Sequence, residues 1–146
     1  MRKYMKGVTL VELMVVVVII SVLMSVAVPS YRQYTMRANR SEGQAMLLQL
    51  AANQERWYLS NNTYANNAQL TQDPPNGLGM RNMSESGFYD LTITASDATT
   101  FSAVSTAQAG QAADTDCDVL AIDATGRRYA GPGPAFAANN NLDKCW

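Results

Sequence analysis

The feature that most constrains this chain is an almost unbroken apolar run from Val8 to Val28. The polar residues that interrupt this run are Thr9, Glu12, Ser21 and Ser25. As an α-helix, a run of about 21 residues extends about 32 Å, which is enough to cross the hydrocarbon core of a bilayer. The whole chain has 146 residues, so the part beyond the run suffices for one compact domain. We therefore expect an apolar stem joined to one polar head.

A cleaved secretory signal peptide is the alternative explanation of the run. Ser25-Val26-Ala27 offers a small-x-small cleavage pattern. The run is longer than the usual signal-peptide core of about 7 to 15 residues, and it carries a carboxylate near its start. Both facts favour a helix that stays in the membrane and contacts its lipids.

Glu12 is the most informative single residue of the stem. An ionisable group inside a membrane segment costs a few kcal/mol, so it normally has a partner. No Lys, Arg or His lies between Val8 and Val28 to supply a cation. Cleavage after Gly7 would create one, because the α-amino group of Val8 would then be free. The alternative is that Glu12 lies at the interface and extends toward lipid headgroups.

The composition excludes the common catalytic arrangements. With no histidine, the chain has no Ser-His-Asp or Cys-His nucleophile and lacks the usual zinc ligands. Asp114, Asp116 and Asp118 alternate as in a calcium loop, but Val119 and Thr125 stand where an EF-hand has glycine and glutamate. We expect a solvated acidic segment there, no catalytic residue, no metal and no cofactor.

Two cysteines, Cys117 and Cys145, lie in the polar C-terminal part of the chain without a CxxC spacing. We expect a structural disulfide, which requires an oxidising compartment and would place the head outside the cytoplasm. Two separate buried thiols are the alternative.

A second helical segment is predicted to follow the stem. Pro29 removes a backbone donor and predicts a kink in a helix that continues beyond it. Apolar residues at helical spacing predict one stripe that packs against a sheet. This stripe consists of Ala45, Leu48, Ala52 and Leu59, flanked by Leu47, Ala51 and Tyr58. The charged residues off the stripe, expected to be solvated, are Arg37, Arg40, Glu42 and Glu55.

The rest of the head changes from turn-rich to alternating sequence. A long polar connection rich in Asn, Pro and Gly runs from Asn61 to Gly87. Beyond it, alternating patterns predict three or four antiparallel strands. Their expected positions are Tyr89, Leu91, Ile93 and Ala95 on one strand face, then residues 99–107 and 119–123, with a turn at 123–126. The last twenty residues read as irregular loop.

A small cationic and aromatic patch near the C-terminus is a candidate DNA contact. It consists of Arg127, Arg128 and Lys144, with Trp146 brought near by the disulfide. Acidic side chains outnumber basic ones nine to four after Arg56, which favours ordinary surface charge over a DNA-binding role.

The sequence Gly7-Val8-Thr9-Leu10-Val11-Glu12-Leu13, after a short basic leader, resembles the processing motif of type IV prepilins. Gln54-Glu55-Arg56-Trp57-Tyr58 with Asn62-Thr63-Tyr64 resembles the helix end of type IVa and minor pilins, and the terminal Cys145-Trp146 resembles PilE-like minor pilins. The resemblance implies an α+β pilin fold, in which a long N-terminal helix packs on a small sheet of three or four antiparallel strands, with a disulfide-bounded C-terminal loop. The implied segments are leader 1–7, membrane and filament-core helix 8–30, amphipathic helix 31–60, loop 61–87, sheet 88–130 and disulfide-bounded region 117–146.

The same resemblance implies the roles of the stem residues. A prepilin peptidase would cut between Gly7 and Val8 and methylate the Val8 amine. Glu12 would pair with the terminal amine of a neighbouring pilin subunit, as the inner-membrane assembly machinery moves the subunit from the lipid into an extracellular filament. We expect a minor pilin subunit; the alternatives are a DNA-uptake receptor and a type II secretion pseudopilin, whereas a membrane-anchored enzyme has no supporting residues.

Overall fold

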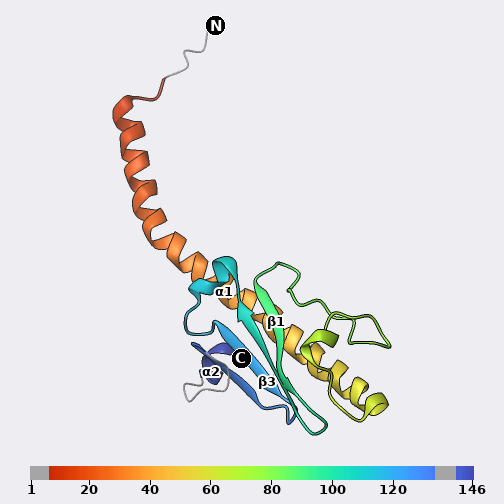
Figure 1. Cartoon of the computed structure of the whole chain (residues 1–146). Coiled ribbons are helices and arrows are strands. Elements are labelled where there is room, and N and C mark those ends of the chain that lie inside the picture. The colour runs from red at the N-terminus through yellow and green to blue at the C-terminus, as the bar shows by residue number, and fades with distance from the viewer. Residues whose placement is uncertain (1–6, 134–140) are drawn as a thin grey trace. The chain divides into compact units, whose positions relative to one another are not determined.

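The computed structural model describes residues 7–133 and 141–146 (Figure 1). The leader residues before Gly7 and the predicted loop residues 134–140 lie outside the described residues. Helix α1 (Leu10–Asn61) runs without interruption through Pro29. The chain divides into two compact units, a stem up to Thr35 and a head from Met36 to Trp146. The kink predicted at Pro29 stays a prediction.

The head contains one antiparallel sheet in the order β1-β2-β3-β4. Its strands are β1 (Tyr89–Ser96), β2 (Phe101–Ala107), β3 (Val119–Asp123) and β4 (Arg128–Gly131). The short helices are η1 (Asn67–Gln69), η2 (Ala109–Ala113) and α2 (Leu142–Cys145). Figure 1 shows the second half of α1 running along the sheet. The predicted α+β fold, a long helix packed on an antiparallel sheet, is confirmed.

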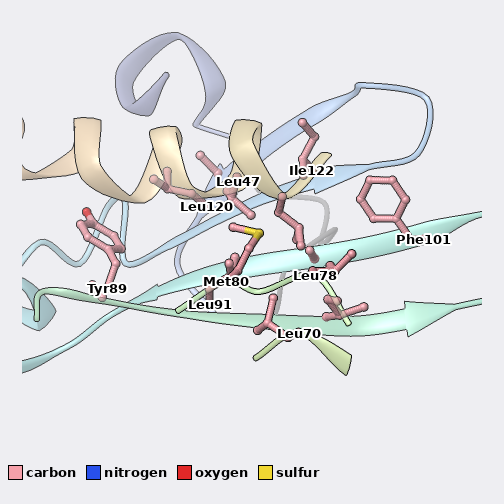
Figure 2. Close-up of a cluster of buried hydrophobic side chains, with 14 of the residues drawn as sticks. Leu47, Leu70, Leu78, Met80, Tyr89, Leu91, Phe101, Leu120 and Ile122 are labelled. Carbon is pink, nitrogen blue, oxygen red and sulfur yellow. The ribbon is translucent and has the colours of Figure 1, made fainter. Parts of the chain in front are cut away.

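The core lies between α1, one face of the sheet and the helix-to-sheet loop. Leu47 and Leu50 of α1 are fully buried, and the loop adds Leu70, Leu78 and Met80 (Figure 2). The sheet contributes Tyr89, Leu91, Ile93, Phe101, Ala103, Leu120, Ile122 and Ala130. Alternate strand positions face the helix, because successive side chains in a strand point to opposite faces.

The face of α1 that packs on the sheet differs from the predicted stripe. The buried helix residues are Arg40, Gly43, Leu47, Leu50 and Gln54. Ala45, Leu48, Ala52 and Leu59 are exposed, Leu59 by 83% of its surface. The prediction was wrong because the true contact face includes a glycine and two polar residues, so apolar character alone selected the opposite face.

Gly43 lies where α1 comes close to the sheet. A Cβ atom at this position would lie 2.8 Å from Tyr89 Cδ1 and 3.0 Å from Ser105 Oγ. Any larger residue would therefore push the helix away from β1 and β2. Glycine in a helix costs up to about 1 kcal/mol relative to alanine, and here the close packing on the sheet offsets that cost.

Strand β1 carries an irregularity between Ile93 and Ala95. The predicted shared face holds for Tyr89, Leu91 and Ile93, which are all buried. Ala95 is exposed, contrary to the prediction, because the bulge shifts the alternation by one residue.

Buried polar and aromatic side chains fasten the helix-to-sheet loop to the end of α1. The Gln54 amide donates to the Ala65 carbonyl at 2.9 Å and accepts from the Ala65 N–H at 2.8 Å. The Tyr64 ring lies 4.8 Å from that of Tyr58 and 5.0 Å from that of Phe101, centroid to centroid. These aromatic residues therefore anchor the core and the loop.

Candidate functional site

The tip of the stem presents a carboxylate in the first turn of α1. The Thr9 hydroxyl accepts from the Glu12 N–H at 3.2 Å, and the Thr9 carbonyl accepts from the Leu13 N–H at 3.2 Å. These bonds satisfy donors that a helix start leaves open. Within the described residues, no cation lies within ion-pairing distance of Glu12. The carboxylate is thus held at a defined place with its charge unpaired.

The stem exposes its apolar surface all round. Large apolar side chains from Val8 to Val28 are about half exposed or more. Among the described residues, α1 is the one helix long and apolar enough to cross a membrane. The Ser21 hydroxyl donates to the Val17 carbonyl at 2.8 Å, and the Ser25 hydroxyl to the Val22 carbonyl at 2.7 Å. Both hydroxyls are therefore satisfied inside the helix, which lowers the cost of placing them in lipid.

A disulfide joins Cys117 and Cys145. Their Cα atoms lie 5.6 Å apart, and both residues are buried. The bond ties α2 to the segment that enters β3. The predicted disulfide is confirmed, and the alternative of two separate thiols is excluded.

Arg40 fastens this C-terminal segment to α1. Its Nε and Nη2 atoms donate to the two carboxylate oxygens of Asp114 at 2.6 and 2.8 Å, and Nη1 donates to the Lys144 carbonyl at 2.8 Å. The Asp114 hydrogen bond raises the pKa of Arg40 above its ordinary value. One turn further on, the Gln44 amide donates to the Cys145 carbonyl at 2.8 Å. We call Arg40, Gln44, Asp114 and the carbonyls they bind the C-terminal clamp.

A polar network extends the clamp beneath the sheet. The Gln111 amide donates to the Tyr89 hydroxyl at 3.2 Å, to Asp114 Oδ2 at 3.2 Å and to the Met36 carbonyl at 3.0 Å. The Asn39 amide donates to Gln111 Oε1 at 3.2 Å. Burial raises the pKa of Tyr89 to about 12. These contacts hold η2 against α1.

The clamp corrects two predictions about solvated charge. Arg40 is 8% exposed, and Asp114 is 7% exposed, so neither is a solvated surface residue. Sequence reasoning missed this pair because the two residues lie 74 positions apart. The available signal was the 3–4 spacing that places Arg40 on one helix face with Gly43 and Leu47.

The remaining acidic residues also have structural partners. Asp116 is exposed and pairs with the Lys144 ammonium, whose hydrogen bond lowers the pKa of Asp116. Glu42, expected to be solvated, accepts from the Ser86 hydroxyl at 2.6 Å, which lowers its pKa. Over the described ranges, no group of three acidic or cysteine side chains is arranged to hold a metal ion.

The structure assembles part of the predicted cationic patch. The Arg128 guanidinium lies 4.9 Å from the centre of the Trp146 ring, and that of Arg127 lies 5.5 Å from the Tyr129 ring. Both arginines are exposed. The Trp146 indole N–H donates to the Tyr129 carbonyl at 2.9 Å, which fixes the ring beside β4. Lys144 belongs to a separate ion pair with Asp116, so the patch offers Arg127 and Arg128 on aromatic supports.

The turn before the patch is tightly organised. Although burial alone would raise it, hydrogen bonds from Thr125, Arg127 and Tyr129 hold the pKa of Asp123 below its ordinary value. Gly126 adopts φ of 76°, a conformation that glycine tolerates best. The predicted turn thus fixes where Arg127 and Arg128 begin the last strand.

Two family models match the chain. The model of the type IV minor pilin ComP, DNA uptake sequence receptor, matches residues 29–121. The chain belongs to this family of type IV minor pilins. The model of the prokaryotic N-terminal methylation motif matches residues 2–28 and covers the whole apolar stem. The prediction of a type IV minor pilin, a structural subunit of a type IV pilus, is confirmed.

Individual relatives agree with the family. The chain is 50% identical over 42 residues to the type IV major pilin protein PilE1 of Neisseria gonorrhoeae and to a fimbrial protein of Neisseria meningitidis serogroup B. The match covers 29% of this minor pilin and about a quarter of each relative. Among solved structures, the non-core minor pilin PilV of Neisseria meningitidis shares the fold with a TM-score of 0.52. It is 17% identical, over 75% of this chain and 98% of that one.

Proposed function

We propose that this minor pilin is a leader-processed subunit whose stem is held first by membrane lipid and then by the filament core. The observation that carries the proposal is the exposed apolar stem with its unpaired carboxylate at Glu12. The helix buries the same apolar surface in lipid and against other pilin helices, so little of that surface meets water in either state.

In the proposed sequence of events, a prepilin peptidase cuts between Gly7 and Val8 and methylates the new amine. The stem then spans the inner membrane, with the head on the periplasmic side, where the Cys117–Cys145 disulfide forms. The inner-membrane assembly machinery transfers the subunit into an extracellular pilus. The match of residues 2–28 to the methylation motif supports this order of events.

Glu12 would set the register of assembly. A terminal ammonium on Val8 of a neighbouring subunit supplies the cation that the described residues of one chain do not. In a water-poor helix bundle an unpaired carboxylate is costly, so only the aligned register is stable. This step requires binding and no catalytic chemistry.

The test compares Glu12→Ala with Glu85→Ala, an exposed glutamate of the head that serves as the matched control. Both variants should insert into the membrane and form the disulfide. We expect Glu12→Ala to be absent from sheared filaments and Glu85→Ala to be recovered at the parental level. Equal recovery of Glu12→Ala would disprove the register role. The intact mass checks processing, because the mature chain should begin at Val8, carry one added methyl group and lack two thiol hydrogens.

DNA binding by the head is a second candidate function. The matching family model describes a DNA uptake sequence receptor, and Arg127 and Arg128 form an exposed pair of cations on aromatic supports. Exposed guanidinium groups bind phosphate, and aromatic rings stack with bases.

A fluorescence-polarisation titration with a labelled DNA duplex at two salt concentrations tests this candidate. Arg127→Ala with Arg128→Ala should weaken binding and reduce its salt dependence by about one unit of slope for each phosphate that an arginine no longer neutralises. Arg81→Ala, on the helix-to-sheet loop, is the matched control. Binding that both variants leave unchanged would remove the patch from the DNA-contact surface.

A further inference from the structure

A hollow at the C-terminal end of α1 is separate from the stem, the clamp and the cationic patch. Its volume is about 370 Å³, which lies within the range of small-molecule sites. The last turns of α1 form one side of it, and residues 74–78 of the helix-to-sheet loop form the other. The residues of α1 that line it are Asn53, Arg56, Trp57, Ser60 and Asn61.

The two sides of the hollow are held in place by the fold. The Leu78 N–H donates to the Gln69 carbonyl at 2.9 Å, and the Asn76 N–H donates to the Asp73 carbonyl at 3.0 Å. Gly77 has no room for a side chain, because a Cβ atom would lie 2.2 Å from the Gln69 carbonyl oxygen. On the helix side, the Asn61 amide donates to the Trp57 carbonyl at 3.0 Å. The hollow is therefore formed before any ligand arrives.

The lining combines apolar rings with amide and hydroxyl groups. Trp57 and the two prolines, Pro74 and Pro75, offer flat apolar surfaces. Asn53, Asn61 and Ser60 carry groups that both donate and accept hydrogen bonds. A sugar ring has this same combination, since its C–H groups form apolar faces and its hydroxyl groups lie around the edge.

Charge selects among sugars. Arg56 is exposed, and across the described part of the chain no carboxylate lies within 4.0 Å of its guanidinium. None of the described residues that line the hollow is acidic. An unpaired guanidinium beside neutral donors favours a ligand with a carboxylate, which it can bind through two parallel hydrogen bonds.

We propose that the hollow between the end of α1 and residues 74–78 binds an acidic sugar. The ring stacks on Trp57 and the prolines, the amides bind its hydroxyl groups, and Arg56 binds its carboxylate. This site would let the head attach to an acidic glycan. It does not depend on Glu12, on leader processing or on the DNA candidate.

The test uses the full chain in phosphocholine micelles, because detergents with sugar headgroups would compete. Trp146→Phe in the background leaves Trp57 as the single tryptophan, so its fluorescence reports the hollow. The two probes are methyl β-glucuronide and methyl β-glucoside, which share the ring and differ at the carboxylate. We expect saturable binding of the glucuronide with a dissociation constant of about 1 mM, and at least about tenfold weaker binding of the glucoside.

Two variants decide whether Arg56 makes the distinction. Arg56→Gln should reduce glucuronide binding at least about tenfold, to the level of the glucoside. Arg37→Gln, an exposed arginine of the same helix, should leave binding unchanged. Equal binding of the two probes, or glucuronide binding that survives Arg56→Gln, would overturn the proposal. So would the absence of any saturable signal, or preferential binding of a tetraproline peptide, which would make the hollow a peptide site.

Discussion

Replacing Arg40 with methionine should destabilise the head strongly without altering the stem. The side chain of methionine fills similar space, but it removes three hydrogen bonds of 2.6 to 2.8 Å. Asp114 would then be a carboxylate at 7% exposure with the Gln111 amide, at 3.2 Å, as its remaining neutral side-chain donor among the described residues. Removing one partner of a buried ion pair costs about 3–5 kcal/mol, because the other charge stays buried and uncompensated.

The measurement is guanidinium-induced unfolding of the oxidised full chain in micelles, followed by the fluorescence of Trp57 and Trp146. Arg40→Met should lower the free energy of unfolding by about 3–5 kcal/mol. Arg37→Met is the matched control, because Arg37 is exposed and lies one turn earlier on the same helix; its effect should stay within about 0.5 kcal/mol.

A double variant separates the cost of a stranded charge from the loss of packing. Combining Arg40→Met with Asp114→Leu removes both charges, and an apolar replacement of a buried pair is often neutral or stabilising. We expect the double variant to recover more than half of the stability lost in Arg40→Met. A cost under about 1 kcal/mol for Arg40→Met, or a double variant less stable than either single variant, would refute this account of the clamp.

Three further predictions concern the head. Gly43→Ala should cost about 1–3 kcal/mol in unfolding free energy through overpacking against Tyr89, despite the better helix propensity of alanine; a stabilised variant would contradict the close contact. Burial raises the pKa of Tyr89 to about 12 from an unfolded value near 10, so its contribution is complete below pH 10 and is lost as the pH rises to 12; Tyr89→Phe should lose less stability than the parent between pH 9 and 12, and parallel curves would refute this. Cys117→Ser should lower the unfolding free energy by about 3–4 kcal/mol and speed limited proteolysis of the C-terminal segment, whereas unchanged digestion would show that the clamp alone holds it.

The stem and the fold class could be predicted from the sequence because their causes are local. The length of the apolar run determines that the helix can cross a membrane, and a single carboxylate inside it has few roles. Alternating residues marked the strands, since strand periodicity follows from the geometry of the backbone. The bulge after Ile93 was missed because it depends on how β1 pairs with β2, which the alternation of one strand does not encode.

The contact face of α1 could not be predicted from the helix sequence. Two stripes with the same 3–4 spacing run along the helix, and the one with Ala45 and Leu48 is the more uniformly apolar. The sheet instead packs on the stripe with Gly43 and Leu47, because the glycine allows close approach. Shape complementarity with a distant sheet decided between the stripes, and no window of helix sequence contains that information.

The sequence by itself therefore determined the apolar stem, its carboxylate at Glu12, the order of helix and strands, and the pair of cysteines. Only the tertiary structure decided that Arg40 is buried against Asp114, that Lys144 pairs with Asp116, and that an open hollow lies beside Trp57. The physical reason is separation along the chain. The energy of a charge or a cavity depends on what the fold brings within a few ångströms of it, and these partners come from different parts of the sequence.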